Sequence, residues 1–100
     1  MTDIDRIIHE PVRLRILAIL TGVDLADFKF LLTTLGLSKG NLSSHIDKLE
    51  QAGYVEVQKG FNGRIPYTDY RITKPGRKAL ADYWAALDRI RTLSREGRAS

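Results

Sequence analysis

The residues best suited to chemistry in this sequence are small and polar, and they occur close together near its middle. They carry hydroxyl, amide, imidazole or ammonium groups, or no side chain at all: Ser38, Lys39, Gly40, Asn41, Ser43, Ser44, His45 and Lys48. Short side chains permit close approach to a partner, and Asn and Lys present donors that suit the edges of adenine and guanine in a major groove. The group therefore predicts hydrogen bonding to a nucleic acid, and a solvated helix face is the alternative.

A strongly basic stretch follows at residues 59–78. It holds six basic residues against Asp69 alone, a net charge of +5, whereas residues 1–38 hold four basic and five acidic residues, a net charge of −1. A local excess of positive charge attracts polyanions and speeds their capture. Lys59 and Arg64 are the predicted contacts to a phosphate backbone or to the adjacent minor groove, and a solvated surface strip is the alternative.

Neither catalysis nor metal binding is predicted. The chain has no cysteine, and its two histidines, His9 and His45, lie far apart, so no metal and no other cofactor is expected. No carboxylate pair, nucleophile with an adjacent base or glycine-rich phosphate loop is evident. His45 falls beside the apolar stripe of its helix, which favours a packed histidine, hydrogen bonded to backbone or phosphate, over a catalytic base or pH sensor.

Three short helices must position these groups, and apolar periodicity predicts them at residues 11–20, 27–35 and 39–52. On the first helix, Arg13 and Arg15 are expected to extend outward. The third helix has two faces of different character.

The apolar face of the third helix holds Leu42, Ile46 and Leu49, which fall within one narrow arc at about 100° per residue and must face the core. The opposite arc, flanked by Asn41 and Lys48, is the face predicted to enter a groove.

After residue 53 the apolar period changes to two, which predicts a β-hairpin with strands at residues 54–58 and 67–72. Asn62-Gly63 is expected to form a type I′ turn, because that turn needs positive φ at both central residues. Pro66 cannot donate to a strand ladder, so it predicts an edge strand near the tip. Phe61 is expected to pack across the strands rather than to act as a wedge.

A final helix at residues 74–93 carries more apolar surface than one core requires, and the polar residues 94–100 are expected to fray. The apolar positions of this helix and of the N-terminal segment include Ile4, Ile7, Ile8, Leu80, Tyr83, Trp84, Leu87 and Ile90. Soluble monomers rarely expose such a patch, so a homodimer through the final helix is predicted. Burial entirely within one chain is the alternative.

The order helix, helix, helix, basic hairpin, helix predicts a mostly helical α+β fold. This order of elements is typical of a winged helix-turn-helix, with a two-stranded basic wing and a C-terminal dimerisation helix. A single domain over residues 1–100 is predicted. The longest apolar run, Ile16–Leu20, is far too short to span a membrane, and the acidic start Met1-Thr2-Asp3 is unlike a signal peptide. A soluble cytoplasmic protein is therefore expected.

Three segments resemble small winged-helix transcriptional regulators related to the ArsR and MarR families. Residues 40–55 resemble their recognition helix and the strand after it, residues 11–17 their first helix, and residues 70–77 the end of their wing and the start of their dimer helix. The resemblance covers roughly residues 8–92 and implies homodimers that bind palindromic operator DNA. By matched position it implies groove contacts for Ser43 and Ser44, and it marks Arg64 as the wing arginine.

Two departures from these families limit what the resemblance implies. The cysteine or histidine clusters of metal-sensing ArsR relatives are absent, and the chain has little room for the longer helices that enclose a phenolic ligand in MarR relatives. The resemblance therefore implies a ligand-free or unusually regulated member.

The sequence as a whole predicts a regulator that binds specific double-stranded DNA as a homodimer. One alternative is a protein-interaction module within a larger assembly, in which the basic wing faces an acidic partner. Another is a sensor with a small effector ligand between its protomers.

Overall fold

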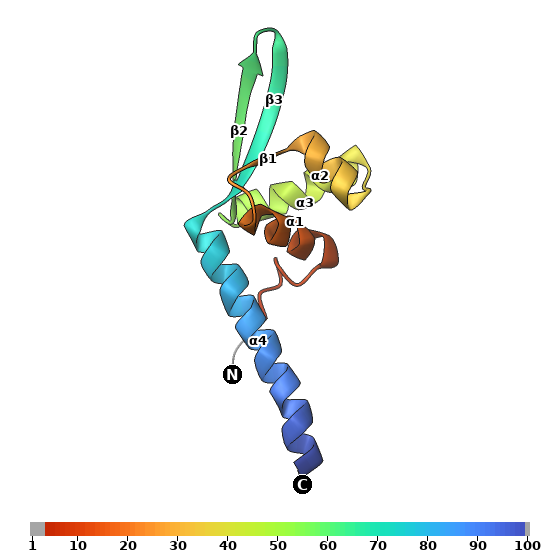
Figure 1. The fold of residues 1–100 in the computed structure, drawn as a ribbon, viewed down its shortest axis with the longest axis vertical. Coiled ribbons are helices and arrows are strands. Elements are labelled where there is room, and N and C mark those ends of the chain that lie inside the picture. The colour runs from red at the N-terminus through yellow and green to blue at the C-terminus, as the bar shows by residue number, and fades with distance from the viewer. Residues whose placement is uncertain (1–3, 100) are drawn as a thin grey trace.

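The computed structural model describes residues 4–99 of the chain, and its side chains up to residue 96. The elements in chain order are α1 (Pro11–Thr21), β1 (Ala26–Asp27), α2 (Phe28–Leu35), α3 (Lys39–Gln51), β2 (Val55–Asn62), β3 (Ile65–Ile72) and α4 (Lys74–Ala99) (Figure 1). Met1, Thr2, Asp3 and Ser100 lie outside the described residues. The order confirms the predicted α+β winged helix-turn-helix.

Side chains just before each of the first three helices satisfy free backbone N–H groups in the first turn. Glu10 accepts hydrogen bonds from the amides of Val12 and Arg13, ahead of Pro11. Asp27 Oδ1 accepts from Phe30 N at 2.7 Å, and Ser38 Oγ accepts from Asn41 N at 3.2 Å. Such caps are each worth about 1 kcal/mol, so they determine where the helices begin.

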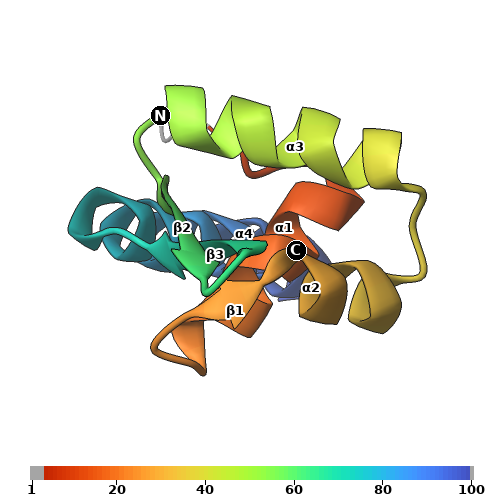
Figure 2. The same cartoon turned by 90° about the horizontal axis from the view of Figure 1, so that it is seen from above.

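The core lies where α1, α2 and α3 meet the base of the hairpin. Leu42, Ile46 and Leu49 are 0%, 3% and 0% exposed, as their shared arc on α3 predicts. Figure 2 shows the ribbon of α3 running along one side of the fold, with α1 and α2 facing it. Since the inner arc of α3 is occupied by the core, its outer arc is left at the surface.

A third strand, β1, was not predicted. Its two residues pair antiparallel with β3, Ala26 with Tyr70 and Asp27 with Asp69, which gives the strand order β1-β3-β2. β3 is therefore central at its base, while nearer the tip it pairs only with β2. Pro66 lies in that outer part, as the missing N–H requires.

The hairpin turn is one residue later than predicted. Asn62 pairs with Ile65, so the two loop residues are Gly63 and Arg64. Gly63 has φ 65°, and no residue other than glycine has positive φ among those described. A type I′ turn at Asn62-Gly63 is therefore wrong, and glycine at the first central position is typical of type II′. This register places Arg64 in the turn itself.

The last helix is longer than predicted, because α4 continues through residues 94–99 instead of fraying. The described chain extends 66 × 26 × 21 Å, and the far end of α4 projects beyond the other elements (Figure 1). Within the part of the chain that the structure describes, no helix combines the length and apolar character that crossing a membrane requires.

The N-terminal segment packs beside α4 as a single turn, although Ile4, Ile7 and Ile8 recur at helical spacing. Asp5 Oδ1 accepts from Ile7 N at 2.8 Å, and Asp5 Oδ2 accepts a hydrogen bond from the Tyr54 hydroxyl. This hydrogen bond is the main cause that raises the pKa of Tyr54 to about 12, with burial and the Asp5 charge adding to it.

We expect Tyr54→Phe to lower the free energy of unfolding by about 1 kcal/mol below pH 10, because it removes a partly exposed hydrogen bond to a carboxylate. The folded-state pKa of Tyr54 is raised, so the contribution is complete below the ordinary value of 10.0 and is lost as pH rises towards 12. Urea unfolding of both proteins at several pH values measures this. A difference that does not shrink above pH 10 would contradict it.

Candidate nucleic-acid interface

The outer face of α3 presents the predicted hydrogen-bonding residues together. Lys39, Gly40, Asn41, Ser43, Ser44 and Lys48 are all exposed, as is the capping residue Ser38. The first turn of α3 contains no acidic residue, so its positive helix end and the Lys39 ammonium are not neutralised there. This end of α3 therefore suits a polyanion.

The second half of α3 is more acidic. Burial first, and then the charges of Asp47 and Glu50, raise the pKa of Tyr70 on β3. Both carboxylate side chains are exposed, three and six residues after Ser44. The electrostatics thus favour the first half of α3 over the second as the part that approaches DNA, which is how recognition helices dock.

His45 lies apart from the groove-facing group. It is half-buried, with its Nδ1 3.1 Å from Nη1 of Arg13 and 3.5 Å from Oε2 of Glu10. A guanidinium can only donate, so Nδ1 is the acceptor in the contact with Arg13. The histidine is packed as predicted, but its partner is the Arg13 side chain instead of backbone or phosphate.

The expectation that Arg13 extends outward from the first helix is also wrong. Its Nε donates to the Ile7 carbonyl oxygen at 2.6 Å while Nη1 donates to His45. Arg13 and His45 therefore hold α1, α3 and the N-terminal segment together. His45 therefore has this positioning role in the structure, in place of the predicted DNA contact.

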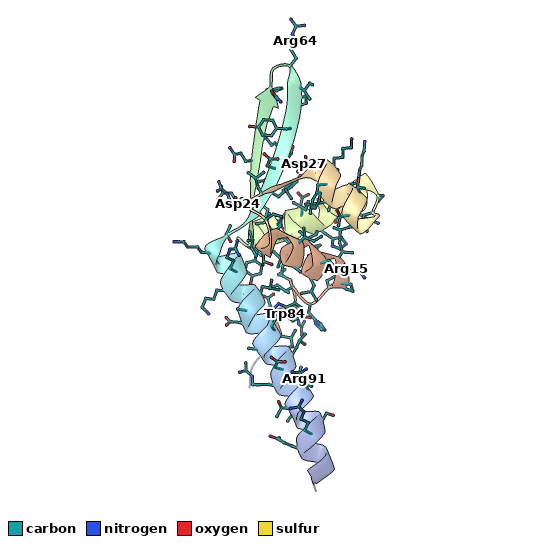
Figure 3. The ribbon with its side chains drawn as sticks, in the orientation of Figure 1. Arg15, Asp24, Asp27, Arg64, Trp84 and Arg91 are labelled. Carbon is teal, nitrogen blue, oxygen red and sulfur yellow. The ribbon has the colours of Figure 1, made fainter. Side chains whose placement is uncertain are left out.

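The basic stretch at residues 59–78 does not form one surface. Lys59 and Arg64 lie exposed on the wing, and Arg64 extends from its tip, away from the body (Figure 3). At the base of the hairpin, Arg71 Nη2 donates to Glu56 at 3.1 Å, and on α4 Lys78 Nζ donates to Asp82 at 2.8 Å. The candidate phosphate contacts are therefore the two wing residues.

A groove between α2 and the wing adds a residue that sequence reasoning missed. It has a volume of ≈ 810 Å³ and its lining includes Phe28, Lys29, Lys39, Pro66 and Tyr67. Lys29 and Lys39, the first residue of α3, thus line the same groove. Only the packing of α2 against β3 could reveal this, because the two lysines are ten positions apart.

The predicted dimer residues divide into two groups. Ile8, Leu80 and Tyr83 are 0%, 4% and 4% exposed and belong to the core of their own chain, so their assignment to an interface is wrong. Tyr83 also contacts His9, whose Nδ1 lies 2.9 Å from the Tyr83 hydroxyl.

The remaining predicted dimer residues are half-buried or exposed. Ile4, Ile7 and Leu87 pack partly on the core. Trp84 and Ile90 are 45% and 52% exposed. Leu93, which was not in the predicted set, is 64% exposed and extends the apolar surface along α4.

The fold and this surface define a winged-helix DNA-binding domain resembling those of transcriptional regulators. Residues 12–91 match the family model of the winged helix DNA-binding domain, and the chain belongs to this family.

The chain is also similar to individual proteins. It is 40% identical over 79 residues to an uncharacterized protein of Methanocaldococcus jannaschii, covering 78% of this chain and 85% of the relative. A solved structure described as a transcriptional regulator homologue from Pyrococcus horikoshii OT3 shares 34% identity with a TM-score of 0.73, covering 86% of this chain and 89% of that one. A solved structure from Enterococcus faecalis V583, described as a transcriptional regulator of the MarR family, shares the fold with 22% identity and a TM-score of 0.70, covering 93% of this chain and 83% of that one.

We expect Asn41→Ala or Ser44→Ala to weaken binding to a preferred DNA site by about 1–3 kcal/mol if the side chain reads a base edge. Both side chains are exposed, so the melting temperature should barely move. Gln51→Ala, at the far end of α3, is the matched control. Titration of each variant against preferred and random duplexes measures the effect. Equal losses of affinity on both duplexes would mean that these side chains contact the DNA backbone and do not read a base.

Proposed function

We propose that this chain is a transcriptional regulator that binds specific sites on duplex DNA as a homodimer and has no enzymatic activity. The observation that carries the proposal is the placement of uncommitted polar side chains on the outer face of α3, together with an exposed arginine at the tip of the wing. The transcriptional regulator homologue of Pyrococcus horikoshii supports it, since it matches this chain over most of its length.

The homodimer is inferred from the apolar stripe of α4. At about 100° per residue, Tyr83, Ala86 and Ile90 fall on one side of the helix. The first two are 4% and 3% exposed because their own chain covers them, whereas Ile90 and Leu93 are 52% and 64% exposed. The far end of α4 projects beyond the other elements (Figure 1). A second copy, related by a twofold axis, would cover this continuation of the stripe.

A twofold dimer has a direct consequence for the DNA site. Two copies of α3 related by the axis would enter successive major grooves, roughly 34 Å apart, so the preferred site should be palindromic. Each half-site would be read by the same residues of α3.

Selection of bound sequences from random duplex DNA tests the proposal. A palindromic consensus would support both sequence-specific binding and the twofold dimer. Absence of enrichment would contradict it and favour a protein-interaction module, for which salt-dependent binding to duplex DNA should be absent.

We expect Arg64→Ala to weaken binding to all duplexes alike and to lower the slope of log affinity against log salt by about one unit, because one phosphate contact is lost. Arg71→Ala is the matched control, since it removes the same group at the base of the hairpin, where it is paired with Glu56. Binding titrations at several salt concentrations measure the slope. A loss confined to the preferred site would instead make Arg64 a base-reading residue.

A further inference from the structure

The tip of the wing exposes two large apolar side chains. Phe61 and Ile65 are 74% and 70% exposed, so the expectation that Phe61 packs across the strands is wrong. Burial of a side chain of this size is worth about 1.5–3 kcal/mol, and neither residue gains it within its own chain. Their exposure needs an explanation outside the chain.

The strand register places these two side chains on opposite faces of the hairpin. Phe61 pairs with Pro66, and the adjacent pair joins Asn62 and Ile65. Successive pairs along a ladder point to opposite faces. The wing tip is therefore apolar on both faces, with Arg64 between them in the turn.

The charges of the wing tip indicate a polyanion as its partner. Residues 57–68 contain two charged side chains, Lys59 and Arg64, and both are positive. The tip also lies at the opposite end of the molecule from the free part of α4, so a dimer through that helix leaves it uncovered (Figures 1 and 3).

We propose that the wing tip enters the minor groove of the bound DNA as a two-faced apolar wedge. Phe61 then packs on deoxyribose groups of one strand, Ile65 packs on those of the other, and Arg64 extends from the turn to a phosphate. This proposal rests on the proposed function and adds apolar contacts to the charged ones. The deoxyribose groups offer apolar C–H surface beside the phosphates, which attract Lys59 and Arg64.

The dimensions of the two partners make this contact sensitive to DNA sequence. A β-ribbon with side chains on both faces is about 10 Å thick, whereas the minor groove of B-DNA is about 6 Å wide. The groove must therefore widen when the tip enters. Widening is easiest at flexible pyrimidine–purine steps and hardest in stiff A-tracts, so the wing reads deformability without reading bases.

Hydroxyl-radical cleavage of the bound preferred duplex tests the contacts, because these radicals attack deoxyribose in the minor groove. The wild type should protect sugars on both strands under the wing. Phe61→Ala should restore cleavage on one strand and Ile65→Ala on the other. Leu25→Ala, which truncates a 50% exposed side chain outside the wing, is the matched control and should change neither.

Affinity for two duplexes that differ only under the wing tests the deformation. We expect the wild type to prefer a flexible pyrimidine–purine segment over an A-tract by about fivefold to tenfold. The Phe61→Ala, Ile65→Ala double variant should lose that preference, while Arg64→Ala should weaken both complexes equally. A preference for the A-tract, an unchanged preference in the double variant, or loss of protection on both strands from either single change would overturn the wedge. If the wild type binds the duplexes but shows no wing protection, only the wedge fails; if it binds no duplex, the proposed function fails with it.

Discussion

Replacement of Ile90 and Leu93 by glutamate should convert a dimer into monomers and weaken binding to a palindromic site by about 10²- to 10⁴-fold, because two linked half-site contacts become independent. Both side chains are exposed within one chain, at 52% and 64%, so the change should not unfold the monomer. It would place two charges in the centre of the apolar contact between the α4 helices, where each would lose its hydration.

Sedimentation at micromolar concentration and titration with the selected site measure the two effects together. The Ala85→Glu, Thr92→Glu double variant is the matched control, because it adds the same charge to the opposite side of α4 at exposed positions. A strictly monomeric wild type would contradict the homodimer, as would an Ile90→Glu, Leu93→Glu protein that stays dimeric and binds its site normally.

Gly76→Ala should lower the free energy of unfolding by about 1–3 kcal/mol. In the interior of a helix this substitution ordinarily stabilises by about 0.5–1 kcal/mol. At Gly76 the new methyl group would overlap the Tyr54 carbonyl oxygen and lie 2.9 Å from Cγ1 of Ile72. A backbone oxygen cannot rotate away, so the steric cost exceeds the gain in helix propensity.

Gly40→Ala is the matched control for this prediction. Gly40 also lies in a helix, but nothing stands within 4 Å of the position that its methyl group would take. Urea unfolding should therefore show Gly40→Ala unchanged or slightly stabilised and Gly76→Ala destabilised. Equal stability of the two variants would mean that α4 shifts away from Tyr54 without cost.

The local elements and the apolar face of α3 could be predicted from the sequence because their causes are short-range. The spacing of Leu42, Ile46 and Leu49 places them on one side of any helix, whatever the rest of the chain does. Ser38 can satisfy the first turn of α3 for the same reason. Because the apolar residues face the core, the polar residues around Asn41 and Ser44 on the opposite side of α3 must be exposed.

Contacts between distant segments were decided only in the tertiary structure. β1 is two residues long, too short to show a period, and exists because Ala26 and Asp27 meet β3. His45 contacts Arg13 instead of facing the groove, and Arg13 lies 32 positions away in sequence.

Which part of the apolar stripe of α4 is buried depends on how far the neighbouring elements extend along the helix, and not on the sequence pattern of the stripe. Tyr83 and Ile90 look alike as apolar residues on one helix face, yet they are 4% and 52% exposed. The difference arises because the N-terminal turn and α1 cover the first half of α4 and end before the second. The sequence by itself determined which residues are apolar and which helix face they share, while the tertiary structure decided which of them still lack a partner, because burial depends on what the rest of the chain can reach.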